Sequence, residues 1–269
     1  MWRKRKGSGL IRLKKTTSSS GFCQDWRIQG PKTTAGCSRV GHCLKHCYYR
    51  GYRFSEDIDF SCRHSGDNLE ASLCLLDMVA LWVFHESGVR LSMRKPVTVP
   101  GDFQIEIPME YNRGGARRQG LPQVKVHLTF DEPILDEAVD CSVTPEYSDL
   151  SAFGITAYSK REIVAEKLRS LLQQQKKWPR PRDLYDLWYI LCKTRERFSW
   201  QELKPLFDEK CRIREVQPDI TSLTSDMLRE WNENAWLNRL GPMLKDVPDF
   251  DRLWKEWVKT FHKLIEDTK

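Results

Sequence analysis

The sequence has no run of apolar residues long enough to cross a membrane, since none approaches the roughly 18 uninterrupted apolar residues that a spanning helix needs. No apolar run of the length found in secretory signals follows the basic opening at residues 1–6. The nine cysteines are an odd number, and none of them forms the Cys-x2-Cys pair of common zinc sites. We therefore expect reduced thiols, a cytoplasmic location and no membrane partner.

Acidic residues are also absent before Asp25, and residues 1–42 show no sustained apolar periodicity. Such a segment buries too little apolar surface to fold, so we predict a poorly ordered tail. Its basic, Ser/Thr-rich composition is also typical of transit peptides and of nucleic-acid-binding arms, which are the alternatives. Zinc held by Cys37, Cys43, Cys47 and the nearby histidines is a weaker alternative because the spacing is poor.

The overall composition is that of an ordinary globular protein, with 40% apolar and 30% charged residues. A length of 269 residues suits one large domain or two modest ones. The net charge of +7 arises from 44 Lys and Arg against 37 Asp and Glu. This balance is compatible with a polyanionic partner but does not require one.

Residues 53–60 alternate polar and apolar side chains, which is the pattern of a half-buried strand. Successive side chains of a strand point to opposite faces, so Asp57 and Asp59 should project together while Ile58 and Phe60 face a core. Neighbouring carboxylates repel each other, and Mg²⁺ is commonly held by one or two carboxylates plus substrate phosphates. The pair is a candidate metal site, although most Asp-x-Asp pairs belong to solvated faces or turns.

The middle of the chain changes from helical spacing to strand alternation. Asp67 or Asn68 can cap a helix that runs to about Glu86. The strands expected after it are 89–93, 103–107, 124–130 and 153–156. Their alternation predicts an antiparallel or mixed sheet with one covered face. The basic loop 112–120 is interpreted as a flexible hairpin or, alternatively, as a loop that grips phosphate or RNA.

Helical spacing dominates beyond Ser159, so the predicted fold class is α+β with an all-helical C-terminal part. The helices are expected over 162–175, 181–193, 200–211, 221–240 and 248–267. An apolar stripe along the last helix predicts core packing rather than a base-stacking platform. It consists of Phe250, Leu253, Trp254, Trp257, Phe261, Leu264 and Ile265.

Two of these helices carry charged residues of interest. Lys167 lies one turn after Ile163 on the apolar side of its helix. An ammonium there can neutralise phosphates or lose its proton to assist a nucleophile; the alternative is a lysine whose stem covers apolar surface. Pro181 suits a first helical position, which puts Asp183 in the first turn and Asp186 about one turn on. The helix dipole favours a carboxylate there whatever the function.

Three segments occur in order along the chain: CLKHCYYRGYRFSEDIDF at 43–60, IVAEKL at 163–168 and RPRDLYDL at 180–187. Together they resemble the core signature and the third and fourth motifs of the AbiEii/AbiGii toxin family of nucleotidyltransferases. The resemblance implies a polymerase-β-like nucleotidyltransferase lobe at 43–158, a helical lobe at 159–269 and a cleft between them.

The resemblance also implies a reaction. A nucleoside monophosphate would pass from a nucleoside triphosphate, such as GTP or CTP, to an RNA acceptor such as the 3′ end of a tRNA. In this likeness Asp57 and Asp59 hold Mg²⁺, and Asp183 orients or deprotonates the acceptor. Arg53 and Lys167 contact the triphosphate. The candidate substrate-binding residues are Gly41, Arg53, Ser55 and Asp186. The implied setting is a toxin–antitoxin or phage-defence pair, with a cognate antitoxin as partner.

The chain departs from the family pattern in two places. Residues 40–44 read Val-Gly-His-Cys-Leu where the family has Gly-Gly-Thr/Ser-Ala-Leu. His42 therefore replaces the Thr or Ser whose hydroxyl can bond the nucleotide phosphates. A frameshifted N-terminal portion would explain this, because Gly-Thr-Ala read one nucleotide out of phase can give Gly-His-Cys. His127 stands where a third carboxylate is expected and is a poor Mg²⁺ ligand, with Glu106 as the candidate substitute. A catalytically decayed member and a basic RNA-binding module using loop 112–120 are the alternatives.

Overall fold

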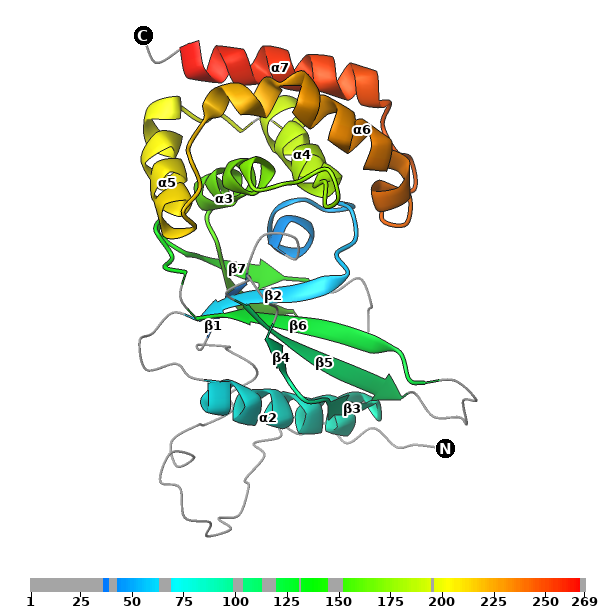
Figure 1. Cartoon of the computed structure of the whole chain (residues 1–269). Helices are drawn as coiled ribbons and strands as arrows, with labels where there is room; N and C mark the ends of the chain where they lie inside the picture. The colour runs from blue at the N-terminus through cyan, green and yellow to red at the C-terminus, as the bar shows by residue number, and fades with distance from the viewer. Residues whose placement is uncertain are drawn as a thin grey trace.

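The computed structural model describes residues 36–38, 43–62, 69–98, 104–112, 120–130, 132–144, 152–194 and 196–266. Eight strands lie in these ranges: β1 (Gly36–Ser38), β2 (Asp57–Cys62), β3 (Arg90–Met93), β4 (Val97–Thr98), β5 (Gln104–Asn112), β6 (Gln123–Thr129), β7 (Val139–Val143) and β8 (Phe153–Ala157). They form one sheet in the order β3-β5-β6-β2-β1-β8-β7, with β4 paired to β5. Figure 1 shows helix α2 (Leu69–Ser87) on one side of the sheet and the C-terminal helices on the other.

The sheet is mixed, as the strand alternation predicts. The pairs β2–β6 and β1–β8 are parallel and the remaining pairs are antiparallel. β2 begins at Asp57, so the prediction of a strand from residue 53 is wrong for its first four residues, which form a loop instead. β1 lies inside the range 1–42 assigned to a tail. The other residues of that range are outside the described part of the chain, and so are 113–119 of the basic loop.

Helix α2 covers one face of β5 and β6, and the predicted helix is confirmed. Its residues Leu69, Leu73, Leu76 and Ala80 pack on a small core that includes Ile107, Met109, Val126 and Leu128. Because side chains alternate along a strand, the neighbours of these core residues point to the opposite face. That second face therefore carries Glu106 on β5, and Lys125 and His127 on β6.

The helical part begins directly after β8. Its elements are α3 (Lys160–Leu172), α4 (Pro181–Trp188) with one further π-helical turn η2 (Tyr189–Lys193), α5 (Trp200–Ile213), the 3-10 turn η3 (Ile220–Thr224), α6 (Asp226–Leu240) and α7 (Phe250–Glu266). Ser159, Ser199 and Ser225 cap α3, α5 and α6 by accepting backbone N–H groups, which fixes where these helices start. The five predicted helices are therefore confirmed, with η2 extending α4 and η3 preceding α6.

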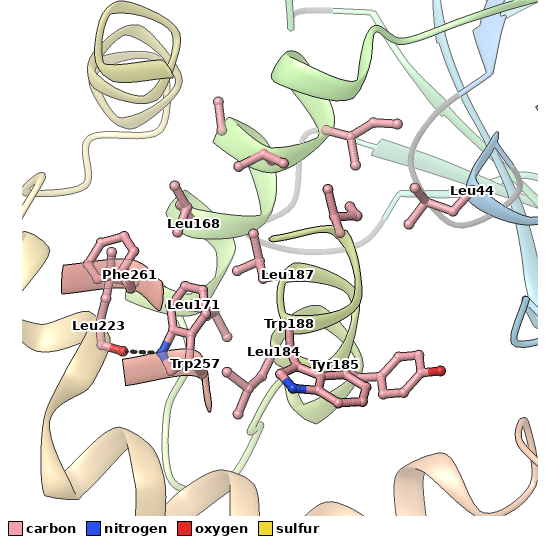
Figure 2. Packing of buried hydrophobic residues seen from close by; sticks show 14 of the residues in the cluster. Leu44, Leu168, Leu171, Leu184, Tyr185, Leu187, Trp188, Leu223, Trp257 and Phe261 are labelled. Atoms are coloured by element: carbon pink, nitrogen blue, oxygen red, sulfur yellow. Dashed lines mark hydrogen bonds between the residues drawn. The ribbon is translucent and has the colours of Figure 1, made fainter. Parts of the chain in front are cut away.

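The apolar stripe of α7 packs into the largest core, as predicted. Phe250, Leu253, Trp254, Trp257 and Phe261 are buried there, while Leu264 and Ile265 are partly buried against it. Figure 2 shows Trp257 and Phe261 beside Leu171 and Leu223, with the indole Nε1–H of Trp257 donating to the carbonyl of Leu223 at 3.0 Å. A buried indole keeps its N–H satisfied in this way, so the stripe is a structural feature.

The large core also takes in residues from the sheet side of the chain. Leu44 of the short π-helix η1 (Leu44–Tyr48), Tyr52 and Ala157 are buried in it with residues of α3 and α4. The carboxylate of Glu162 on α3 accepts the backbone N–H groups of Leu135 and Asp136. The sheet and the helices are thus held together by shared packing.

No described helix is both long and apolar enough to cross a membrane.

Candidate functional site

Asp57 and Asp59 lie at the start of β2, on the face of the sheet that points away from α2. Ser61 has the same orientation on this strand, and its hydroxyl contacts the phenol of Tyr158, which belongs to the helical core. Because residues two apart on a strand share a face, this contact puts both carboxylates on the helical side of the sheet. The predicted projection of Asp57 and Asp59 together is therefore what the strand shows.

The parallel neighbour β6 places two more charged groups beside these acids. Lys125 is in register with Asp57, and His127 is in register with Asp59. The imidazole Nδ1 of His127 lies 2.9 Å from Oδ1 of Asp59, and its Nε2 lies 3.3 Å from Oε2 of Glu106 on β5. The hydrogen bond with Asp59 is the main cause that raises the pKa of His127 above its ordinary value. His127 thus bridges two carboxylates across three strands.

Glu106 faces the same side of the sheet as Asp59, which the sequence could not decide. The Lys125 ammonium donates to its Oε2 at 2.9 Å. This hydrogen bond, together with the one to His127, lowers the pKa of Glu106. Glu106 is therefore ionised beside the β2 acids, but its carboxylate already has two hydrogen-bonding partners, Lys125 and His127.

Asp57 has a different electrostatic environment from that of Asp59. Burial raises its pKa above the ordinary value, His127 opposes this shift, and the nearby carboxylates of Asp59 and Glu56 add to it. In the described part of the chain, no Lys, Arg or His nitrogen lies within ion-pairing distance of its carboxylate. A cation next to Asp57 would favour the ionised form, so this position is suited to a metal ion or another positive group.

A second group of charged side chains is buried on the helical side. The guanidinium of Arg53 holds Asp186 of α4 through two hydrogen bonds of 2.6 Å, from Nε to Oδ1 and from Nη2 to Oδ2. Its third nitrogen, Nη1, donates to the carbonyl of Phe54 at 3.0 Å. Tyr52 donates its hydroxyl to Asp186 at 2.6 Å. Each of the three nitrogens of Arg53 donates at least one hydrogen bond within this buried group, so most of its five N–H groups are already used.

Lys167 joins this group from α3. Its ammonium lies 2.7 Å from Oδ1 of Asp183 and 2.5 Å from Oδ2 of Asp186. Burial alone would raise the pKa of Asp183, but Lys167 and Arg180 outweigh it and lower the pKa to about 2. A carboxylate with so low a pKa is a weak base. Lys167 is therefore an ion-paired lysine rather than one whose stem merely covers apolar surface.

The two groups are linked through the loop that precedes β2. Arg53 lies four residues before Asp57 in the chain, and the hydroxyl of Ser55 donates to the backbone carbonyl of Asp57 at 3.1 Å. Arg182 of α4 contacts Glu56 with an Nη1 to Oε2 distance of 3.1 Å. The N-terminal turn of α4 thus lies against the start of β2. Among the predicted site residues, only Gly41 lies outside the described part of the chain.

Several residues of the site were not singled out from the sequence. Tyr52 binds Asp186 and Arg180 lies beside Asp183, both of them predicted site residues. Arg182 contacts Glu56, next to Asp57, and Lys125 binds Glu106, the candidate substitute for a third carboxylate. The two arginines belong to the RPRDLYDL segment, so the motif itself could have indicated them. Tyr52 likewise lies in the 43–60 segment, whereas Lys125 lies in none of the three segments, and its role depends on the register of β6 against β5.

The carboxylates of the site fit Mg²⁺ only if a bound substrate supplies further ligands. No group of three or more His, Cys, Asp or Glu close enough to hold a metal ion occurs in the described ranges. The zinc alternative stays untested, because the side chains of Cys37, His42 and His64 lie outside the described part of the chain. Asp57 and Asp59 supply two carboxylates on one face, and Mg²⁺ commonly takes one or two carboxylates together with substrate phosphates. The two acids would therefore need the phosphates of a bound nucleotide to complete the coordination.

Comparisons with known proteins give the family and the fold. The family model described as "Nucleotidyl transferase AbiEii toxin, Type IV TA system" matches residues 41–258. Among solved structures, MenT4, a nucleotidyltransferase toxin from Mycobacterium tuberculosis H37Rv, is similar with a TM-score of 0.57 and 15% identity, covering 85% of this chain and 75% of that one. JHP933 from Helicobacter pylori is similar with a TM-score of 0.51 and 15% identity, covering 87% of this chain and 85% of that one. Identities this low show the fold alone.

The comparison with curated protein sequences gives no match. The family model nevertheless spans most of the chain and includes all three segments on which the resemblance rests. The chain therefore belongs to the AbiEii family of nucleotidyl transferase toxins of type IV toxin–antitoxin systems.

Proposed function

We propose that this protein moves a nucleoside monophosphate from a nucleoside triphosphate, such as GTP or CTP, to a hydroxyl of an RNA acceptor such as the 3′ end of a tRNA. Pyrophosphate is the second product. The observation that carries this proposal is the pair Asp57 and Asp59, which share the helical side of β2 with the N-terminal turn of α4 beside them. Family membership supports the reaction type.

The two acids are the proposed Mg²⁺ ligands. When bound, Mg²⁺ would neutralise the phosphates and stabilise the charge that develops during transfer. The carboxylate of Asp57 is suited to this role because it lacks an ion-pair partner among the described residues and burial penalises its charge. Asp59 would exchange its contact with His127 for the metal.

Lys167 and Asp183 are the proposed contacts at the reacting groups. The pKa of about 2 makes Asp183 a poor proton acceptor, so we assign it to orient the acceptor hydroxyl rather than to deprotonate it. Lys167 is the proposed phosphate contact, because an ammonium can turn between oxygen partners more freely than a clamped guanidinium. Arg53 and Asp186 hold Lys167 and Asp183 in place.

The biological setting follows from the family and stays at the level of a proposal. We propose that a cognate antitoxin opposes this protein in the cytoplasm, in a toxin–antitoxin or phage-defence pair.

Ser55 and Gly41 remain proposed substrate contacts. For Ser55, the hydrogen bond to the carbonyl of Asp57 places the hydroxyl at the start of β2.

The test is transfer of label from each of four α-labelled nucleoside triphosphates to total tRNA in the presence of Mg²⁺. Asp57→Ala should abolish incorporation, whereas Asp251→Ala, which removes an exposed carboxylate of α7, should leave it unchanged. Incorporation that survives in Asp57→Ala would refute the proposed site. Both variants should be compared by thermal unfolding, so that loss of fold is not mistaken for loss of chemistry.

A catalytically decayed protein is the second candidate, and the contact of His127 with Asp59 favours it. A protonated imidazole at 2.9 Å competes with a metal for the same carboxylate. A decayed member would bind no nucleoside triphosphate tightly, with or without Mg²⁺. Calorimetric titration with the triphosphates separates the two candidates, because an active enzyme should bind at least one of them in a Mg²⁺-dependent way.

A further inference from the structure

A pocket of about 530 Å³ lies between helix α6 and the turn that joins α3 to α4. The side chains that line it include three cations, one indole and two amides, and no carboxylate: Lys176, Lys177, Arg239, Trp231, Asn234 and Asn238. A concave surface of one charge sign attracts ligands of the opposite sign. The composition of this pocket therefore points to an anionic ligand that also has flat apolar groups.

The turn presents its side chains in a fixed geometry. The backbone N–H of Trp178 donates to the carbonyl of Gln175 at 2.8 Å, so Lys176 and Lys177 occupy the tip of a tight turn. The side-chain oxygen of Gln174 accepts from Asn232 of α6 at 3.0 Å and from the backbone N–H of Arg180 at 3.1 Å. These bonds tie the base of the turn to α6, and a fixed surface loses less entropy when it binds a ligand.

The side chain of Trp178 is 59% exposed, and in the chain this residue stands between Lys177 and Pro179, which both line the pocket. The ammonium of Lys177 lies 4.9 Å from the ring centroid of Trp178. An exposed indole beside a cation is the combination with which proteins bind single-stranded nucleic acid, where bases stack on aromatic rings and cations contact the phosphates.

We propose that this pocket is the docking site for a single-stranded segment of the RNA acceptor, an inference that rests on the proposed function. A base stacks on Trp178, while Lys176, Lys177 and Arg239 contact phosphates. The position suits this role, because the lining residue Pro179 is followed directly by Arg180. Nη1 of Arg180 lies 3.6 Å from Oδ2 of Asp183. A strand held in the pocket thus lies next to the N-terminal turn of α4.

The test measures RNA binding alone, without nucleoside triphosphate or Mg²⁺, by fluorescence anisotropy of a labelled single-stranded RNA of about 12 nucleotides. Trp178→Ala should weaken binding by roughly 5- to 150-fold, the effect of losing one stacked base. Its matched control is Phe84→Ala, which removes another exposed aromatic ring beside a cation, Arg90, on the far side of the sheet. The control should bind RNA like the wild type.

The lysines are tested through the salt dependence of the same measurement. The double variant Lys176→Ala, Lys177→Ala should lower the slope of log affinity against log salt by about 1.4, because each single-strand phosphate contact contributes about 0.7. The double variant Lys255→Ala, Lys259→Ala removes the same charge from the exposed side of α7. Its slope should lie closer to the wild-type slope than the slope of the Lys176→Ala, Lys177→Ala variant does. Equal slopes for the two double variants would contradict the phosphate contacts.

The outcomes separate this inference from the proposed function. If Trp178→Ala weakens RNA binding, and Asp57→Ala binds RNA normally but transfers no label, both are supported. If wild-type protein transfers label but Trp178→Ala binds RNA as well as Phe84→Ala does, the docking site is wrong and the function stands. If no single-stranded RNA binds to the wild type, the docking site is overturned. RNA binding that Trp178→Ala weakens, without transfer of label by the wild type, would leave an RNA-binding pocket but remove the proposed function and with it the role of this RNA as acceptor.

Discussion

The Arg53 guanidinium meets the Asp186 carboxylate side by side, with both hydrogen bonds at 2.6 Å and side-chain exposures of 5% and 0%. Burial would penalise each charge on its own; Asp186 raises the pKa of Arg53, and Arg53 and Lys167 lower that of Asp186. The pair joins the loop before β2 to helix α4. It therefore fixes the position of the β2 acids relative to the groups on α4.

Breaking this pair should destabilise the protein strongly. Asp186→Asn leaves the buried Arg53 with a neutral partner, and removing one member of a buried ion pair typically costs about 3–5 kcal/mol. Urea unfolding at neutral pH measures the change. Asp251→Asn is the control, because its ion pair with Arg229 is exposed and exposed pairs contribute about 1 kcal/mol or less. Similar free energies of unfolding for the two variants would show that the buried pair adds little.

Lys167 and Arg53 should differ in their effects on activity. Lys167→Met should lower the transfer rate by about 100-fold or more at a temperature where the variant is folded, which is the usual effect of losing one transition-state contact. Arg53→Lys keeps a charge but loses the paired geometry, so it should lower stability while changing the transfer rate much less. If folded Lys167→Met transfers label at the wild-type rate, Lys167 only supports the fold.

The stability of the protein should fall in acid partly because of Asp183. Its pKa is lowered from 3.8 to about 2 in the folded state, so its stabilising contribution is fully present above pH 3.8 and is lost as the pH falls through about 2. A shift of this size corresponds to a contribution of about 2 kcal/mol. Asp183→Asn should be less stable than the wild type at pH 6, and this difference should shrink toward pH 2. Urea titrations at several pH values measure both curves, and a difference that stays constant with pH would contradict the assignment.

The sequence predicts best those parts of the fold that depend on short-range periodicity. The alternation at residues 57–60 indicates that Asp57 and Asp59 share a face, and the spacing of Leu69, Leu73 and Leu76 indicates the helix that covers the opposite face. Strands β1, β4 and β7 were not predicted, and β1 has only three residues. β4 has only two residues, and β7 reads Val-Asp-Cys-Ser-Val with little apolar content between its ends. Neither length nor pattern distinguishes such segments from loops.

The long-range pairings could not be predicted in the same way. The alternation of residues 53–56 resembles a strand, but these residues form a loop because Arg53 binds Asp186, 133 positions away in the chain. The sequence also left the facing of Glu106 open, since it depends on the register between β5 and β6. The motifs indicated which residues gather at the site, but only the pairing of strands and helices shows which groups neutralise each other.

Replacing His127 by Asp should make the β2 acids respond more strongly to Mg²⁺. The variant adds a carboxylate next to Asp59 and Glu106, so without metal the like charges should lower the melting temperature. Mg²⁺ relieves this repulsion and binds the folded state only, so it should raise the melting temperature by about 2–4 °C for each kcal/mol of binding free energy. His127→Asn is the matched control, because it removes the imidazole without adding a charge. The measurement is thermal unfolding of both variants in Mg²⁺ and in EDTA. If Mg²⁺ stabilises His127→Asp no more than His127→Asn, the carboxylates on this face of the sheet do not hold the metal.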